Sequence, residues 1–170
     1  MSIKMPKVLK NMNLFIDGRG YAGRVDEIEL PKLALKTEEH RAGGMDVPVE
    51  IDLGMEKLEA TLTLSDYDPE LFKLYGMVAN DSVAITIRGA IQAQGDTAKP
   101  VVANMRGGWR ELDSGTWKPG DKSTVKIAVI ANYYKLSIDG EELIEVDAIN
   151  LVRKVNGTDQ MEAIRSAIGL

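Results

Sequence analysis

The sequence predicts a mainly β protein: an antiparallel β-sandwich or partial barrel with one flanking α-helix and a short C-terminal helix. Three observations predict this fold class. Most of the chain alternates apolar and polar residues with the period of two that is typical of strands. Turn sequences such as Asp139-Gly140 separate these stretches. One internal stretch has helical periodicity, and it begins with the helix-start signal Asp68-Pro69.

The composition fits a single domain that spans residues 1–170. The chain is 44% hydrophobic and 28% charged, as in an ordinary globular protein. Its net charge of −5 argues against a surface that grips nucleic acid phosphates, which requires clustered Lys and Arg. The absence of Cys excludes disulfides and thiolate chemistry. The chain also has no apolar signal-peptide core and no run of about 18 apolar residues, so we expect a soluble protein made in the cytoplasm.

Strands account for most of the first half. Residues 12–17 (MNLFID) and 24–37 (RVDEIELPKLALKT) have the strand pattern, and Pro31 interrupts the second because it cannot donate a ladder hydrogen bond. Residues 38–48 (EEHRAGGMDVP) have no periodicity but contain two adjacent glycines and a proline, so we expect a long loop. The alternating pattern resumes at residues 49–53 and 58–66.

Two segments are expected to be helical. In residues 68–81 (DPELFKLYGMVAND), Asp68 caps the helix and Pro69 takes its first position. Its apolar face holds Leu71, Leu74, Tyr75 and Val78, and Asn80 is a left-handed stop. The tail, residues 156–170, predicts a short helix with Thr158 or Asp159 as cap and Gly169 as stop.

The second half predicts long strands at residues 82–94, 99–112 and 123–138, with a turn-rich segment at 113–123. The hairpin at residues 133–147 (YYKLSIDGEELIEVD) then has two candidate registers. A two-residue loop at Asp139-Gly140 would force acids onto the apolar face, whereas a three-residue loop, Ile138–Gly140, shifts the pairing by one residue and avoids this. We therefore expect the three-residue loop, with Tyr134 opposite Ile144, Leu136 opposite Glu142, and Ile130 and Val146 on the same side.

In that register Glu141, Glu145 and Asp147 project from one solvent-exposed face of the hairpin, with alternate residues of a strand roughly 7 Å apart. Two such carboxylates could act as acid and base only if different environments separated their pKa values. Because nothing in the sequence supplies a pocket, a solvated strand face is the better interpretation.

The remaining candidates for chemistry are isolated residues. His40 is the single histidine, and a loop histidine that makes a polar contact is a simpler interpretation than a base or metal ligand. Trp109, Trp117 and the pair Tyr133-Tyr134 could form a stacking platform, but strand packing or interface anchoring explains them better. No catalytic triad, phosphate-binding loop or calcium loop is present. The sequence therefore predicts no enzyme, no cofactor and no metal site.

Long strands with alternating faces leave unpaired edges, and unpaired edges invite aggregation unless something covers them. Few features of this chain would cover its strand edges: one proline (Pro31), one helix and a short tail. A homo-oligomer whose copies pair their edges and close one sheet would remove the edges altogether.

Three segments also resemble one protein family. They are NMNLFIDG (11–18), ELPKLALKTEEHRAGGMDVPVEIDLGMEKLEA (29–60) and the end from YYKLSIDG to Ile-Gly-Leu (133–170). Together they resemble the major tail tube proteins of contractile-tailed bacteriophages and of R-type pyocins, which are headless, tail-like tailocin particles. The resemblance covers nearly the whole chain and is weakest over residues 64–105.

The resemblance implies a homohexameric ring whose strands join into one inner barrel, with rings stacked into a tube inside a contractile sheath. Sheath, baseplate and tail terminator proteins would be its partners. The tube would be driven through the target envelope, and DNA in a phage, or ions in a pyocin, would pass through its lumen. The protein would lie in the virion tail or the tailocin particle, after assembly in the host cytoplasm.

By the same resemblance, the segment from Glu38 to Pro48 reaches a neighbouring subunit or ring, and residues 156–170 pack at an interface. The inter-subunit loop residues are His40, Arg41, Gly43, Gly44 and Met45. From charge alone, Glu141, Glu145 and Asp147 are the expected lumen-facing acids, because an acidic lumen would repel phosphates.

Two other classes stay open. A type VI secretion-like tube protein would have the same architecture, and only neighbouring genes would separate it from a phage or pyocin tube. A carbohydrate-binding β-sandwich would use Trp109 and Trp117 to stack sugars. An enzyme that depends on His40 is the weakest alternative.

Overall fold

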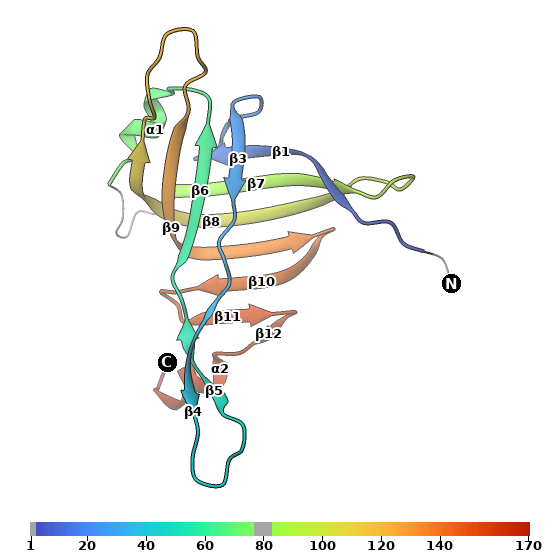
Figure 1. Cartoon of the computed structure of the whole chain (residues 1–170), viewed down its shortest axis with the longest axis vertical. Helices are drawn as coiled ribbons and strands as arrows, with labels where there is room; N and C mark the ends of the chain where they lie inside the picture. The colour runs from blue at the N-terminus through green and yellow to red at the C-terminus, as the bar shows by residue number, and fades with distance from the viewer. Residues whose placement is uncertain (1–2, 77–82) are drawn as a thin grey trace.

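The computed structural model describes residues 3–76 and 83–170, which form two antiparallel sheets and two short helices (Figure 1). In chain order the elements are β1 (Val8–Ile16), β2 (Arg19–Gly20), β3 (Val25–Glu29), β4 (Leu35–His40), β5 (Val49–Met55), β6 (Leu58–Leu64), α1 (Pro69–Lys73), β7 (Val83–Gln92), β8 (Lys99–Asp113), β9 (Val125–Ile138), β10 (Glu141–Asp147), β11 (Val152–Val155), β12 (Thr158–Asp159) and α2 (Glu162–Ala167).

The main sheet is folded over itself into two crossing layers. Its strands follow the order β12-β11-β10-β9-β8-β7-β1-β2, and β6 pairs with both β9 and β3. Figure 1 shows β3 and β6 running steeply across β7 and β8. Apolar side chains from both layers fill the space between them, as in a β-sandwich. The largest fully buried side chains include Leu14, Ile16, Leu62, Leu64, Ile85, Met105, Trp109, Ile127 and Tyr134.

The layers are joined where β9 changes its partner. Its first half pairs with β6 as far as Ala131, and its second half pairs with β10 from Tyr133 onward. Asn132 between them is a bulge, since Arg106 pairs with Tyr133 while Gly107 pairs with Ala131. The bulge also changes which residues face the core: Val129 is buried before it and Tyr134 after it. The prediction that Ile130 shares the side of Tyr134 is therefore wrong.

Gly107 is required at this crossing by the close approach of two backbones. A Cβ atom built on Gly107 would lie 2.1 Å from the carbonyl oxygen of Ile130 and 2.9 Å from the Cα of Ala131. Both of these are backbone atoms, which cannot turn aside as a flexible side chain can. Any other residue at position 107 must push β8 and β9 apart.

The predicted internal helix is shorter in the structure. Asp68 caps α1 as expected, because its Oδ1 accepts a hydrogen bond from the Glu70 amide at 3.0 Å, and Pro69 opens the helix. The helix ends at Lys73, with Leu74 as its C-cap, because the Leu71 carbonyl accepts a hydrogen bond from Trp109 Nε1 at 2.9 Å, while the Tyr75 amide donates to the Phe72 carbonyl. The predicted span 68–81 is thus wrong at residues 74–76, and Val78 and Asn80 lie outside the described residues.

The C-terminal helix begins later than predicted. Thr158 and Asp159 form strand β12 instead of capping α2, whose first flanking residue is Met161. The predicted stop is confirmed: Gly169 has φ +86°, its amide donates to Ser166, and the Leu170 amide donates to Arg165. These two bonds make a Schellman motif.

The hairpin at residues 133–147 differs from the predicted register. Ile138 pairs with Glu141, so the loop has two residues, Asp139 and Gly140, and both have positive φ as a type I′ turn requires. A bulge between Glu142 and Ile144 then shifts the pairing. It places Ile144 opposite Leu136 and Val146 opposite Tyr134. The predicted three-residue loop is therefore wrong. With a two-residue loop, the bulge shifts the register by one residue and so keeps Glu145 and Asp147 off the apolar face.

The predicted loop at residues 38–48 is partly strand. Glu38, Glu39 and His40 belong to β4 and pair with Ile51, Glu50 and Val49 of β5. The strand pattern predicted over residues 24–37 covers the first half of β4, but periodicity missed Glu38 to His40, because every residue of β4 is exposed and no buried face imposes alternation. The predicted break at Pro31 is confirmed, since β3 ends at Glu29 and β4 begins at Leu35.

Replacing Gly107 with Ala tests the crossing of β8 and β9. The added methyl should lower the free energy of unfolding by about 1–3 kcal/mol, as overpacking does, with a fall in Tm of roughly 2–4 °C per kcal/mol. Thermal and urea unfolding of the purified protein measure both. Gly43→Ala is the matched control, because nothing lies within 4 Å of a Cβ at that position. Equal effects of the two substitutions would contradict the account of the crossing.

Candidate functional site

The main sheet presents one polar face. Register places successive polar side chains in rows across its strands, for example Thr86, Asn104, Lys135, Glu145 and Lys154. The side chains that alternate with them, such as Ile85, Met105 and Tyr134, are buried in the core. We call this surface the polar sheet face, and it comprises Asn13, Thr86, Arg88, Asn104, Arg106, Tyr133, Lys135, Ser137, Glu142, Glu145, Asp147 and Lys154.

Two acids of the polar sheet face, Glu142 and Glu145, are paired with cations. Lys135 Nζ lies 2.7 Å from Glu142 Oε1, and this ion pair lowers the pKa of Glu142 and raises that of Lys135. Glu145 Oε2 lies 3.8 Å from Lys154 Nζ. The face is therefore close to neutral. Its cations Arg88, Arg106, Lys135 and Lys154 are opposed by Glu142, Glu145 and Asp147, and by Asp159, which continues the row of Lys154 on the adjacent strand β12.

Two of the three acids singled out from the sequence lie on this face. Glu145 accepts a hydrogen bond from the Tyr133 hydroxyl at 3.0 Å. Burial opposes ionisation of Asp147, but hydrogen bonds from Asn150 and from the Ile149 amide outweigh it and lower its pKa. Glu141 pairs with Ile138 in the other row, so the expectation that it shares their face is wrong, and Glu142 takes its place.

Both ends of the main sheet leave backbone edges open within the described residues. At one end, β2 pairs only with Phe15 and Ile16 of β1, so the outer edge of β1 from Val8 to Leu14 has no partner strand. At the other end, β12 pairs only with Lys154 and Val155 of β11. The two open edges lie at opposite ends of one continuous sheet. Open edges of this kind are templates for pairing with another chain.

Strands β4 and β5 form a hairpin that projects past β11 and β12 (Figure 1). Its tip contains the residues predicted for an inter-subunit loop, Arg41, Gly43, Gly44 and Met45, and His40 ends β4 beside them. The hairpin exposes a row of aliphatic side chains, with exposed fractions of 69% for Val47, 49% for Val49, 45% for Ile51 and 51% for Leu53. Contiguous exposed aliphatic side chains do not stabilise a single copy, and they are typical of surfaces that bind another protein. The hairpin is therefore a candidate interaction surface.

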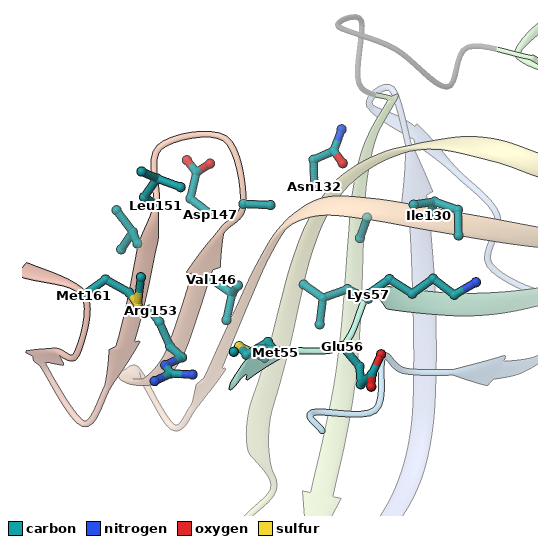
Figure 2. Close-up of a pocket in the computed structure, with 15 residues that line it drawn as sticks. Met55, Glu56, Lys57, Ile130, Asn132, Val146, Asp147, Leu151, Arg153 and Met161 are labelled. Atoms are coloured by element: carbon teal, nitrogen blue, oxygen red, sulfur yellow. The ribbon is translucent and has the colours of Figure 1, made fainter. Parts of the chain in front are cut away.

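A groove of about 430 Å³ lies at the base of this hairpin, between β10, β11 and the start of α2 (Figure 2). Met55, Leu58, Ile130, Val146, Leu151 and Met161 supply its apolar lining. Two of its charged groups have partners, since Arg153 Nη2 lies 3.3 Å from Asp52 Oδ2 and Asp147 accepts hydrogen bonds from the Ile149 and Asn150 amides, whereas the buried Nε of Arg153 has no hydrogen-bond partner. The arrangement ties the hairpin to β11 and provides no acid–base pair.

The C-terminal segment is also poorly covered. No residue of α2 is buried, and Ile164, Ile168 and Leu170 are exposed. Its attachment is polar: Arg165 donates to the Leu151 carbonyl at 2.7 Å and pairs with Asp159 Oδ2 at 2.6 Å. This geometry fits the expectation that the segment has a further contact surface.

Other candidates from the sequence are not brought together. Trp109 is fully buried, so it cannot stack a sugar, and the carbohydrate-binding alternative fails at that residue. Trp117 is exposed and lies edge-on to Tyr67 at 5.9 Å between ring centroids. His40 pairs with Val49 on the exposed hairpin. Across residues 3–76 and 83–170, no group of three or more His, Cys, Asp or Glu side chains is arranged to hold a metal ion.

The described part of the chain contains no helix long and apolar enough to cross a membrane.

Sequence reasoning predicted open strand edges but did not identify β1 as the strand that carries one, and it missed the groove. The edge could have been found from Lys4, Lys7 and Lys10, since lysines are typical of strand edges exposed to water. The groove has no local sequence signal, because its lining comes from strands far apart in the chain.

Comparison with known proteins gives a consistent match over the whole chain. The family model for phage tail tube protein FII matches residues 6–169. The tail tube protein of Escherichia phage P2 is 39% identical over 171 residues, which cover 98% of this chain and 99% of that protein. The major tail tube protein of Serratia phage KSP20 is 34% identical over 169 residues, which cover 98% of each chain.

Solved structures confirm the predicted fold class. The sheath/tube terminator of an extracellular contractile injection system matches 80% of this chain and 99% of its own, with a TM-score of 0.62 and 14% identity. A chain of the sheath–tube complex of such a system matches 78% of this chain and 91% of its own, with a TM-score of 0.59 and 14% identity. At 14% sequence identity, these matches show a shared fold and nothing about function.

The ion pair between Arg165 of α2 and Asp159 of β12, which attaches α2 to the sheet, leads to a pH-dependent prediction. The hydrogen bonds from Arg165 and from the Met161 amide lower the pKa of Asp159 to about 2 from its ordinary 3.8. Because the folded pKa is depressed, the stabilisation is present above pH 3.8 and is lost as the pH falls through about 2. An NMR titration of the Asp159 carboxyl carbon should therefore have a midpoint near 2. In the Arg165→Met variant the midpoint should return toward 3.8. A midpoint near 3.8 in the unchanged protein would show that Arg165 and Asp159 do not form this ion pair.

Proposed function

Because the chain belongs to the phage tail tube protein FII family, we propose that it forms hexameric rings that stack into the inner tube of a contractile tail. It is a structural protein of the phage tail tube and not an enzyme, and its place is therefore the virion tail. The rings, their stacking and the partners named below are parts of the proposal.

The observation that carries the proposal is the pair of open edges at opposite ends of the main sheet. The β1 edge of one copy and the β11–β12 edge of the next can pair, which continues the sheet from copy to copy. Contacts between two different surface patches are heterologous, and they close into a ring when the rotation between copies allows it. Ring closure would satisfy the backbone groups that a single copy leaves open, each bond contributing about 0.5–1.5 kcal/mol.

In such a ring the polar sheet face lines the lumen, while β3 and β6 lie outside it. Its acids and cations nearly balance, so the face would neither attract nor repel DNA strongly. Glu142, Glu145 and Asp147 are the lumen acids in this arrangement, in place of the set that included Glu141. DNA would pass because the nearby acids offset the Lys and Arg side chains that could otherwise bind its phosphates.

The projecting hairpin and the C-terminal segment would make the remaining contacts between copies. His40, Arg41, Gly43, Gly44 and Met45 would lie at the boundary with a neighbouring subunit. Sheath, baseplate and tail terminator proteins would be the other partners, in line with the sheath–tube complex that the fold resembles. The same tube would serve an R-type pyocin, where ions pass instead of DNA, and capsid genes beside this one would separate the two.

Negative-stain electron microscopy of the purified protein tests the proposed function. Across a concentration series, hollow cylinders or rings of uniform width are the expected particles. Compact single particles at every concentration, also after addition of baseplate components that nucleate tubes, would overturn it.

Reversing two acids tests the lumen assignment. Glu142→Lys/Glu145→Lys turns paired cations into a free basic cluster, so DNA ejection from phage particles should slow severalfold while the tubes still form. Fluorescence of a DNA dye during triggered ejection measures the rate. Glu27→Lys/Glu29→Lys on β3 is the matched control, since it adds the same charge away from the polar sheet face. Loss of assembly in the first variant alone would place these acids at an interface and contradict the assignment.

A further inference from the structure

Arg153 of β11 occupies a position that faces the apolar side of the main sheet. The register pairs it with Val146 of β10, which is only 8% exposed. Its neighbour Lys154 pairs instead with Glu145 on the polar sheet face. Because paired residues lie on the same face of a sheet, the Arg153 side chain points away from the polar sheet face, and it is 17% exposed. A charged group in such a place is costly unless its donors have partners.

The donors of Arg153 are only partly satisfied. Its Nη2 lies 3.3 Å from Asp52 Oδ2. Its Nε has no hydrogen-bond partner, and within residues 3–76 and 83–170 it is the single buried side-chain nitrogen or oxygen atom of which this is true. Buried polar groups without a partner are rare and call for an explanation. Because the Nε–H group of arginine can only donate, what the site lacks is an acceptor.

The space beside this donor is the groove at the base of the hairpin (Figure 2). Met55, Val146 and Met161 contribute apolar walls from three different parts of the chain. The volume of about 430 Å³ suits a small molecule. Apolar walls with a small number of polar groups are the usual form of a small-molecule site, because the walls supply affinity and the polar groups fix the orientation.

The turn that enters β11 is strained at the wall of the same groove. Leu151 has φ +55°, whereas the other non-glycine residues with positive φ in the described part of the chain are Asp17, Asp139 and Asn156, whose side chains tolerate that region. The Leu151 conformation is held from outside, since its carbonyl accepts a hydrogen bond from Arg165 Nη1 at 2.7 Å. Strained residues fixed by their surroundings are typical of ligand-binding sites, and this one lines the groove two residues before Arg153.

The charges around the groove select a neutral ligand. Arg153 and Lys57 would repel a cation, and Glu56 and Asp147 would repel an anion. The unpaired buried atom is a donor, and no buried side-chain acceptor of the described residues is unpaired. This combination favours a ligand that brings an acceptor without a donor. The carbonyl of an ester meets both conditions, and an aliphatic chain suits the apolar walls.

We propose that this groove binds a neutral aliphatic ester, whose carbonyl oxygen accepts a hydrogen bond from Arg153 Nε and whose chain lies against Met55, Val146 and Met161. The inference goes beyond the proposed function, because every group that it uses belongs to one copy and no ring is required. A bound ester stabilises the folded subunit by mass action, since the unfolded chain has no groove.

Methionine methyl NMR of the full-length free subunit tests the site. Met55 and Met161 line the groove, whereas Met105 is buried in the core and does not line it. In a titration with methyl hexanoate, the methyl signals of Met55 and Met161 should shift and saturate together, with one ester bound per subunit, while that of Met105 stays in place. Hexanoate and hexylammonium, which have similar chains but charged head groups, should bind roughly tenfold more weakly or worse.

A single substitution isolates the donor. Arg153→Lys keeps a positive charge beside Asp52 but removes the Nε–H group, so the affinity for methyl hexanoate should fall roughly tenfold. Arg110→Lys is the matched control, because Arg110 pairs with Glu59 as Arg153 pairs with Asp52 but lies outside the groove, and the affinity should not change. Thermal unfolding without ester checks that both variants are folded.

Several outcomes would overturn the inference. One is the absence of a saturable shift with methyl hexanoate, and another is equal binding of the ester and the two charged molecules, a comparison that needs no variant. Unchanged affinity in folded Arg153→Lys would exclude the proposed hydrogen bond. Tighter binding of N-acetylleucine methylamide than of the ester would assign the groove to a peptide segment. If ring formation itself shifts the Met55 and Met161 signals and excludes the ester, the groove belongs to a contact between copies.

Discussion

The architecture depends on one close contact between backbones, where Gly107 of β8 passes the Ile130 carbonyl of β9. At this point β9 bulges at Asn132 and exchanges its partner β6 for β10. The exchange folds one sheet over itself, so that β3 and β6 cover one side of the core while β7 to β11 continue as a long, one-sided sheet. Without the crossing, that sheet would have no apolar partner for its inner face and no separate polar face.

A sheet built in this way has two ends that the chain itself does not close. Strand β2 is too short to cover β1, and β12, which ends the sheet beyond β11, has no partner strand on its outer side within the described residues. Natural proteins usually blunt such edges, and here lysines at the start of β1 and a hairpin beyond β11 are the visible devices. Both features oppose random edge pairing by charge, because each places charged side chains beside an edge strand.

The sequence predicted the elements whose signals are local, and it failed where distant contacts decide. Asp68 and Gly169 act as cap and stop because a cap depends only on its own helix end. The length of α1 was not predictable, because the indole of Trp109, thirty-eight residues further along, takes the carbonyl of Leu71. The register of the 133–147 hairpin failed for a related reason: a bulge after Glu142 adds a residue that no turn signal announces. The second half of β4 was missed because it buries nothing. The acidic character of the polar sheet face was overestimated because the cations opposite Glu142 and Glu145 come from β9 and β11.

Amide hydrogen exchange along β1 tests most directly whether copies complete one another's sheet. In the assembled protein, amides between Val8 and Leu14 that point away from β7 should become strongly protected relative to the free subunit, together with those on the outer side of β12. Exchange at these amides that stays as fast in assembled tubes as in free subunits would contradict edge pairing, whatever the shape of the particles.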